Sequence, residues 1–195
     1  MSRDRIILGI DPGTQVFGWG VIKVTAGRAE YLAMGVSSLK GLPDHFAKLS
    51  RIFCEVKLLI GRFSPDQMAV EAPFYGKNIQ SMLKLGRAQG AAIAAALSCG
   101  MDVYEYAPRK IKLSITGKGA ASKEQVANVI SKILNVSDVS ASYDATDGLA
   151  VALCHFLSDS VPQELRSIKR AGSSGQGKSS GGWSSFVKSN PDRIK

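Results

Sequence analysis

The chain has 195 residues, 45% of them hydrophobic, and a formal net charge of +9, which indicates one globular domain followed by a tail. No apolar stretch reaches the roughly 20 residues that a membrane-spanning helix needs, and the N-terminus shows no signal-peptide pattern. The sequence therefore predicts a cytoplasmic protein with no membrane partner. Three widely spaced cysteines without metal-ligand spacing predict reduced core residues: Cys54, Cys99 and Cys154.

The positive charge is concentrated in two segments. Residues 166–195 carry seven Lys/Arg and one acid and are rich in Gly and Ser, so we expect a basic, largely disordered tail after a domain at 1–165. Residues 77–123 also carry a net charge of +6. This inner cluster favours a polyanionic partner, although a solvated basic face explains the charge equally well.

The chain opens with a short buried strand. Ile6–Ile10 is almost entirely aliphatic, and it runs into Asp11 and then into a Pro-Gly turn. Two β-rich segments follow at Val16–Val24 and Glu30–Leu39, separated by a short turn. Such short connections predict an antiparallel meander.

Helices and strands alternate after the meander. Apolar residues at helical spacing predict an amphipathic helix over 44–63. A second helix, over 79–99, carries Gly86 and Gly90 among alanines, which suit either packing on its own sheet or a dimer seam. The other expected segments are strands at 67–71 and 102–106, a basic loop at 110–123, and helices at 123–134 and 143–158.

This order predicts an α/β fold with a five-stranded mixed sheet flanked by helices. The first, fourth and fifth strands should be parallel, because helices connect them. Two of these strands end in an acid, Asp11 and Glu71. Parallel neighbours would bring both carboxylates to one edge of the sheet.

Two more acids lie at the start of the last helix. Asp144 and Asp147 are three residues apart, so both project from one helix face, and Gly148 leaves room for the helix to approach the sheet. Three of the four acids also have a structural reading. Asp11 suits the start of a turn, Asp144 suits an N-cap, and Asp147 suits the helix dipole.

Convergence of the four acids would require charge compensation. At about 4 Å and an effective dielectric of about 20, each pair of carboxylates costs about 4 kcal/mol. Either some carboxylates are protonated or divalent cations hold them together. Hard oxygen ligands suit Mg²⁺ or Mn²⁺, and two such ions serve phosphoryl transfer.

The motifs around these acids resemble the RuvC family of Holliday-junction resolvases. The resemblance rests on LGIDPGT, on VEAPF followed by KN, on LKLGRAQG and on YDATDGLAVALCH, in order over residues 5–158. It implies an RNase H-like fold, a homodimer, and a Mg²⁺-dependent endodeoxyribonuclease that nicks four-way junction DNA, with Mn²⁺ able to substitute. It also implies two ions per active site and a branch-migration helicase partner of the RuvA and RuvB type. The catalytic, metal-binding acids would be Asp11, Glu71, Asp144 and Asp147.

Further positions follow from the same resemblance. Phe74 matches an aromatic residue that stacks on bases at the junction centre, and Lys112 and Lys123 match active-site lysines. A lysine there could neutralise charge that develops in the transition state. No motif of the resemblance covers His45 and His155, which read as structural, with a place near the site as the alternative for His155. The implied phosphate contacts are Lys77, Lys84, Arg87, Arg109, Lys110 and Lys118.

Two other classes of protein deserve comparison. IDPGT before a hairpin also begins actin-like and sugar-kinase ATPases, but about 160 ordered residues leave no room for their second half. A junction-binding module without cleavage is the other alternative, and the presence of all four acids argues against it. The resemblance says nothing about the tail from about residue 166.

Overall fold

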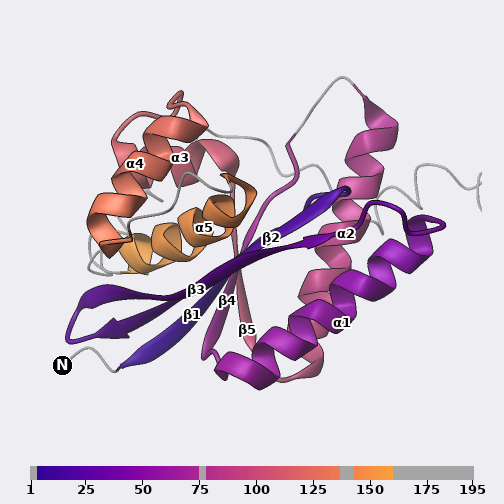
Figure 1. Ribbon diagram of the computed structural model, residues 1–195, viewed down its shortest axis with the longest axis horizontal. Helices are drawn as coiled ribbons and strands as arrows, with labels where there is room; N and C mark the ends of the chain where they lie inside the picture. Colours follow the sequence, from indigo (N-terminus) through magenta and orange to yellow (C-terminus); the bar gives the residue numbers. More distant parts are fainter. Residues whose placement is uncertain (1–3, 75–77, 137–142, 160–195) are drawn as a thin grey trace, which may run out of the picture. The chain divides into compact units, whose positions relative to one another are not determined.

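The computed structural model describes residues 4–74, 78–136 and 143–159, with side chains of the last segment from residue 144. The expected tail at 166–195 and Lys77 lie outside the described residues. The described residues form the following strands and helices (Figure 1). They are β1 (Arg5–Asp11), β2 (Val16–Thr25), β3 (Arg28–Ser38), α1 (His45–Phe63), β4 (Gln67–Glu71), α2 (Ile79–Ser98), β5 (Asp102–Tyr106), α3 (Pro108–Thr116), α4 (Lys123–Leu134) and α5 (Tyr143–Asp159).

The five strands form one mixed sheet in the order β3-β2-β1-β4-β5. β1 to β3 form the expected antiparallel meander, while β4 pairs parallel with both β1 and β5. In the β1–β4 ladder Ile10 lies opposite Val70. The next residues of the two strands, Asp11 and Glu71, therefore end side by side at one edge, as the strand pattern predicted.

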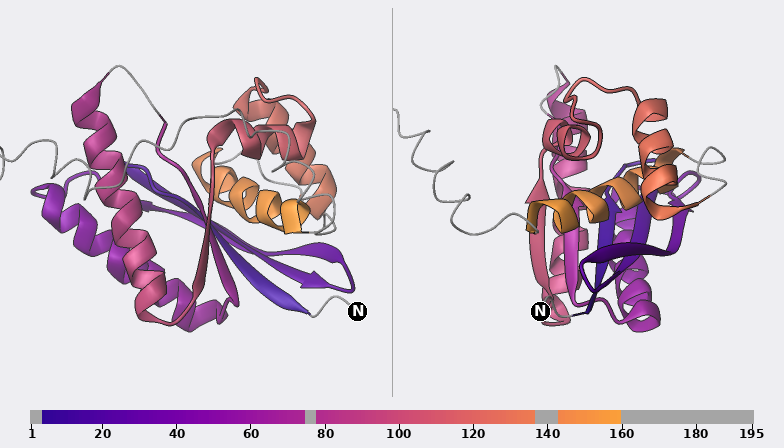
Figure 2. Two further views of the ribbon diagram at one scale, coloured as in Figure 1. Left: turned by 180° about the vertical axis from the view of Figure 1, so that it is seen from behind. Right: turned by 90° about the vertical axis from the view of Figure 1, so that its left-hand side faces the viewer.

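Helices cover both faces of the sheet (Figures 1 and 2). Leu8 and Ile10 of β1 point into a core with α1 and α2, whereas Ile7 points into a second core with α3, α4 and α5. This alternation follows from the two-residue period of a strand. It also places the side chain of Asp11 on the α5 side of the sheet.

Glycines let α5 lie directly on β1 and β2. A Cβ added at Gly148 would lie 2.4 Å from the Trp19 carbonyl carbon, and one at Gly9 would lie 2.5 Å from the Ala152 nitrogen. Because both neighbours are backbone atoms, the helix could not approach this closely with larger residues. The expectation for Gly148 is confirmed, and the contact brings the first turn of α5 to the sheet edge.

Two expectations were wrong. The segment from Lys110 onward is not a basic loop, because α3 occupies Pro108–Thr116. Proline at the first turn, buried Ile111 and Ile115 one turn apart, and Gly117 at φ 74° define this helix. Cysteines at 54 and 99 are exposed, and only the one at 154 is buried, although all three are free thiols as expected.

The small residues of α2 divide between two sides of the helix. Ala88, Ala92 and Ala96 are buried in the core that α2 forms with α1 and the sheet, whereas a Cβ at Gly86 or Gly90 would meet nothing within 4 Å. The glycines therefore do not serve packing on the sheet. None of the helices in the described part of the chain has the length and hydropathy to cross a bilayer.

Candidate active site

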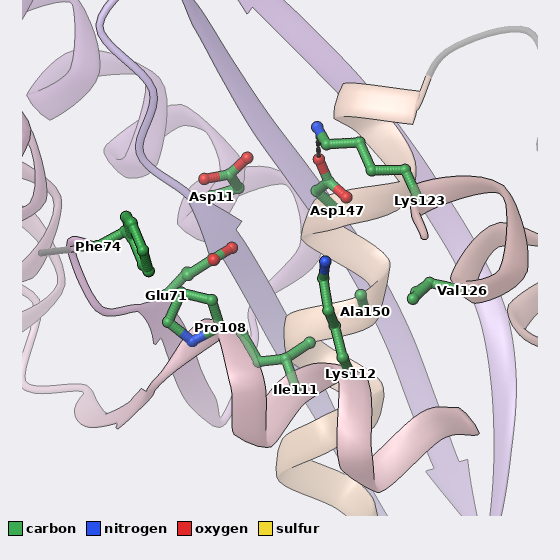
Figure 3. A pocket seen from close by; sticks show the side chains of 10 residues that line it. All are labelled: Asp11, Glu71, Phe74, Pro108, Ile111, Lys112, Lys123, Val126, Asp147 and Ala150. Carbon is green, nitrogen blue, oxygen red and sulfur yellow. Dashed lines mark hydrogen bonds and ion pairs between the residues drawn. The ribbon is translucent and has the colours of Figure 1, made fainter. Parts of the chain in front are cut away.

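Three of the predicted acids line one hollow of about 240 Å³ at the sheet edge (Figure 3). Asp11 ends β1, Glu71 ends β4, and Asp147 comes from the second turn of α5. We call this group, together with Asp144, the carboxylate cluster. The carboxylate of Asp11 faces the hollow (Figure 3). The remaining lining residues are Phe74, Pro108, Ile111, Lys112, Lys123, Val126 and Ala150.

Lys123 of α4 lies near both Asp147 and the fourth acid, Asp144. Its Nζ lies 2.6 Å from Oδ2 of Asp147 and 3.7 Å from Oδ1 of Asp144. Asp144 lies within the first turn of α5, which begins one residue earlier, rather than at its N-cap. Its side chain is half exposed and lies at the rim of the cluster.

Burial, with a smaller contribution from neighbouring acids, raises the pKa of two of the carboxylates. Burial raises the pKa of Asp11 to about 6, with further contributions from the charges of Asp147 and Asp144. Burial also raises the pKa of Glu71 to about 8, and the neighbouring charges of Asp11 and Asp147 add to this. At neutral pH the metal-free site therefore holds Glu71 mainly in its protonated form, which relieves part of the expected repulsion.

Two lysines supply positive charge. Burial lowers the pKa of Lys123, but the hydrogen bond and charge of Asp147, with the charge of Asp144, outweigh burial and leave the pKa raised. Lys112 of α3 points into the hollow toward Glu71 (Figure 3) and lowers the pKa of that acid. Both predicted lysines therefore lie with the carboxylates.

The donor set fits a divalent cation by chemistry. Carboxylate oxygens from three elements converge on one hollow, and two of the acids have raised pKa values that a cation would reverse. Among residues 4–74, 78–136 and 143–159, no three His, Cys, Asp or Glu side chains already form a complete metal site. Lys123 instead holds Asp147 in an ion pair, so this lysine provides the charge compensation at the helix.

The predicted DNA contacts fall into separate places. Phe74 is 70% exposed beside the carboxylate cluster, and Arg109 lines an adjoining apolar hollow with Phe74. Lys84 lies across the sheet edge, beside α1, and the charge of Arg87 acts on His45 there. Lys110 and Lys118 are exposed and line none of these hollows in the described residues.

Sequence reasoning missed a buried glutamine behind the site. Gln89 of α2 is 8% exposed, and its Nε2 donates to the Glu71 carbonyl oxygen at 3.2 Å and to Oε1 of Glu105 at 2.6 Å. It ties α2 to the strand end that carries the acid. A polar residue at a core position of an alanine-rich helix was the available signal.

His155 is structural, as predicted. It is 1% exposed, and its Nδ1 lies 2.7 Å from the Tyr106 hydroxyl while its Nε2 lies 3.1 Å from Oε1 of Gln67. The network fastens α5 to β4 and β5 below the carboxylate cluster.

Sheet order, parallel strand-end acids and a glycine-packed final helix together define a nuclease of the RNase H-like class. Residues 7–155 match the family described as "Crossover junction endodeoxyribonuclease RuvC". The chain belongs to the RuvC family.

Relatives support this assignment over almost the whole chain. RuvC of Cytophaga hutchinsonii is 50% identical over 192 residues, covering 98% of this chain and 89% of that protein. RuvC of Bacteroides fragilis is 49% identical, covering 99% and 97%. The structure is also similar to T. thermophilus RuvC in complex with Holliday junction substrate, with a TM-score of 0.73, 32% identity, and coverage of 80% and 94%.

Proposed function

We propose that this RuvC-family enzyme resolves four-way DNA junctions by paired, symmetric nicks that leave 5′-phosphate and 3′-hydroxyl ends, as part of homologous recombination and DNA repair. The observation that carries the proposal is the convergence of Asp11, Glu71 and Asp147 with two lysines in one hollow. The complex of T. thermophilus RuvC with a Holliday junction substrate supports the choice of substrate.

The carboxylate cluster would hold the metal. We propose Mg²⁺, replaceable by Mn²⁺, with two ions per site bound by Asp11, Glu71, Asp144 and Asp147. Such ions would supply an activated water and neutralise charge on the phosphodiester oxygens. Lys112 lies where it would stabilise the negative charge that develops on the scissile phosphate.

The protein surface around the cluster suits DNA. The exposed ring of Phe74 lies at the mouth of the hollow and offers a flat apolar face on which an unpaired base can stack. Arg109 and Lys112 line the apolar hollow beside it and would contact the backbone. We assign the other predicted contacts to the phosphate backbone as well; they are Lys77, Lys84, Arg87, Lys110 and Lys118.

A homodimer would place two such sites on the two strands of like polarity. We propose that α2 forms its seam, because Ile79, Leu83 and Leu97 are 69%, 52% and 59% exposed and share a helical stripe with the outward-facing Gly86 and Gly90. We also propose a branch-migration helicase complex of the RuvA and RuvB type as partner. Action on chromosomal DNA and the free thiols favour the cytoplasm as its location, with residues 166–195 as a basic tail.

The test is cleavage of a synthetic four-way junction, beside a linear duplex of the same sequence. Wild-type protein should nick the junction symmetrically in Mg²⁺ and not in EDTA. D11N and D147N should bind the junction with unchanged affinity but cut at least 100-fold more slowly, since each removes a carboxylate ligand. D102N, which changes an exposed acid at the start of β5, should cut like wild type.

Each failure has a distinct meaning. Binding without nicking across a panel of junction sequences would show that the protein is a junction-binding module without cleavage activity. Equal affinity for junction and duplex would overturn the substrate. Unchanged nicking by D147N would remove this residue from the site.

A further inference from the structure

A second polar hollow, of about 370 Å³, lies on the α1 and α2 side of the β1–β2 turn. We call it the cationic hollow. The residues that concern its chemistry are Thr14 and Gln15 of the turn, His45 and Lys48 of α1, and Ser81 and Lys84 of α2. Three separate segments therefore place cations and hydroxyl groups around one space.

His45 lacks a hydrogen-bond partner in this hollow. Its Nε2 is buried, and within the described part of the chain no atom accepts from it or donates to it. Burial lowers the pKa of His45, and the charges of Arg87, Lys84 and Lys48 lower it further. An unsatisfied ring nitrogen beside three cations is a costly arrangement that an anion would correct.

Among the described residues that line the hollow, the one acid is already engaged. Asp44 caps α1, and its Oδ1 accepts a hydrogen bond of 2.8 Å from the Ala47 backbone nitrogen. Lys48 donates through Nζ to the Thr14 carbonyl oxygen at 3.1 Å, which holds its ammonium at the β1–β2 turn. Positive charge therefore exceeds negative charge around the space.

The cationic hollow and the carboxylate cluster are connected by residues that are neighbours in the sequence. A smaller hollow, which shares Asp11, Glu71 and Phe74 with the active-site hollow, is also lined by Pro12 and Leu85. Leu85 directly follows Lys84 on α2, and Pro12 lies two residues before Thr14 on the β1–β2 turn. The same two segments thus lead from the acids to the cationic hollow.

We propose that the cationic hollow binds a backbone phosphate of the DNA strand that leaves the carboxylate cluster across the β1–β2 turn. Lys84 and Lys48 provide its charge, and the Nε2–H of His45 donates to a phosphate oxygen. This inference rests on the proposed junction-cleaving function. It adds His45 and Lys48 to the DNA interface and predicts that DNA binding takes up a proton at His45, because an anion stabilises the imidazolium.

The first experiment measures junction affinity in EDTA, so that no strand is cut. K84Q should weaken binding about tenfold and reduce the slope of log Kd against log salt by about one. H45Q should weaken binding more at pH 6 than at pH 8, because only the protonated ring carries charge. K57Q, which removes an exposed lysine elsewhere on α1, should match wild type in affinity and slope. Wild-type affinity for both K84Q and H45Q would overturn the proposal.

The second experiment needs no substitution in the protein under test. The chain has two histidines, so comparison with H45Q assigns the imidazole C–H resonance of His45. Its pKa should rise by at least one unit when a short junction is added, and an unchanged pKa would contradict the proposal. If inorganic phosphate raises the pKa and junction DNA does not, the hollow binds free phosphate rather than DNA.

The two proposals fail separately. Wild-type protein that neither prefers nor cuts the junction would refute the proposed function. If wild-type protein cuts the junction but the pKa of His45 does not change when DNA is added, only the proposal for the cationic hollow is refuted.

Discussion

The carboxylates at the strand ends destabilise the folded protein when they are ionised. Asp11 and Glu71 end neighbouring parallel strands, and both have raised pKa values caused first by burial. A structure optimised only for stability would not place acids there. The cost has a measurable dependence on pH.

E71Q should stabilise the metal-free protein at high pH. Unfolded chains lose the Glu71 proton near its ordinary pKa of 4.5, whereas the folded protein keeps it until about 8. Stability therefore falls as pH rises through this window and stays low above it. Gln cannot ionise, so in EDTA the Tm of E71Q should exceed that of wild type by several degrees at pH 8.5 and equal it at pH 4.

Mg²⁺ provides the complementary measurement. It should raise the wild-type Tm at pH 8.5 and have little effect on E71Q, because a cation and a proton compensate the same charge. D102N serves as the control for loss of one exposed acid. A Tm difference between E71Q and wild type that is the same at both pH values would show that Glu71 does not ionise in this window.

The positions of Asp11 and Glu71 at one sheet edge could be predicted from a local signal, because each directly follows a buried apolar run. Lys123 was placed with them because its motif resembles the family. The cationic environment of His45 was not found, because Lys84 comes from a second helix, which a strand separates from the helix that carries His45 and Lys48. Only the fold brings such residues together.

At the scale of elements, the position of α5 decides whether the last two acids reach the sheet edge. Gly148 of the helix lies on the backbone of Trp19 and Gly20. The sequence showed this glycine beside two acids, and the close approach could be predicted from it. The boundaries of α3 could not be predicted, because the basic residues of this segment made it look like a loop. Its two buried isoleucines, Ile111 and Ile115, became apparent only in the structure.

G148A should separate the helix from the sheet. The added Cβ would lie 2.4 Å from the Trp19 carbonyl carbon and 2.6 Å from the Gly20 nitrogen, and neither backbone atom can yield without moving a strand. We expect a loss of about 1–3 kcal/mol in the free energy of unfolding. Nicking should fall about 100-fold, because Asp147 shifts relative to Asp11. Urea denaturation and junction cleavage measure the two effects.

G61A is the matched control for this substitution. Gly61 also lies inside a helix, α1, and a Cβ there meets nothing within 4 Å. Alanine should leave nicking unchanged and raise stability by up to about 1 kcal/mol. Equal stability of G148A and G61A would mean that the helix–sheet contact tolerates a methyl group.

For the whole molecule, the two faces of the sheet serve different purposes. The face with α3, α4 and α5 surrounds the acids, while α1 and α2 cover the other face and leave an apolar stripe on α2 exposed. Composition and periodicity predicted both layers. They left open whether the glycines of α2 served the sheet or a partner, because helical spacing alone does not say which side faces the core.

L83E tests whether that stripe joins two copies of the chain. Leu83 is a 52% exposed member of the stripe, so a buried glutamate there would disrupt a dimer seam. Sedimentation should show a dimer for wild type and a monomer for L83E. The monomer should still nick single strands of a junction, but the two nicks should lose their symmetry and simultaneity.

L58E is the appropriate control, because Leu58 is also an exposed leucine, 67% accessible, on a helix of the same face. It should sediment as a dimer and produce paired nicks. If both variants remain dimeric, the seam lies elsewhere and the α2 stripe needs another occupant. If L83E is monomeric yet still cuts both strands together, pairing of the nicks arises from the junction itself rather than from two-fold symmetry of the protein.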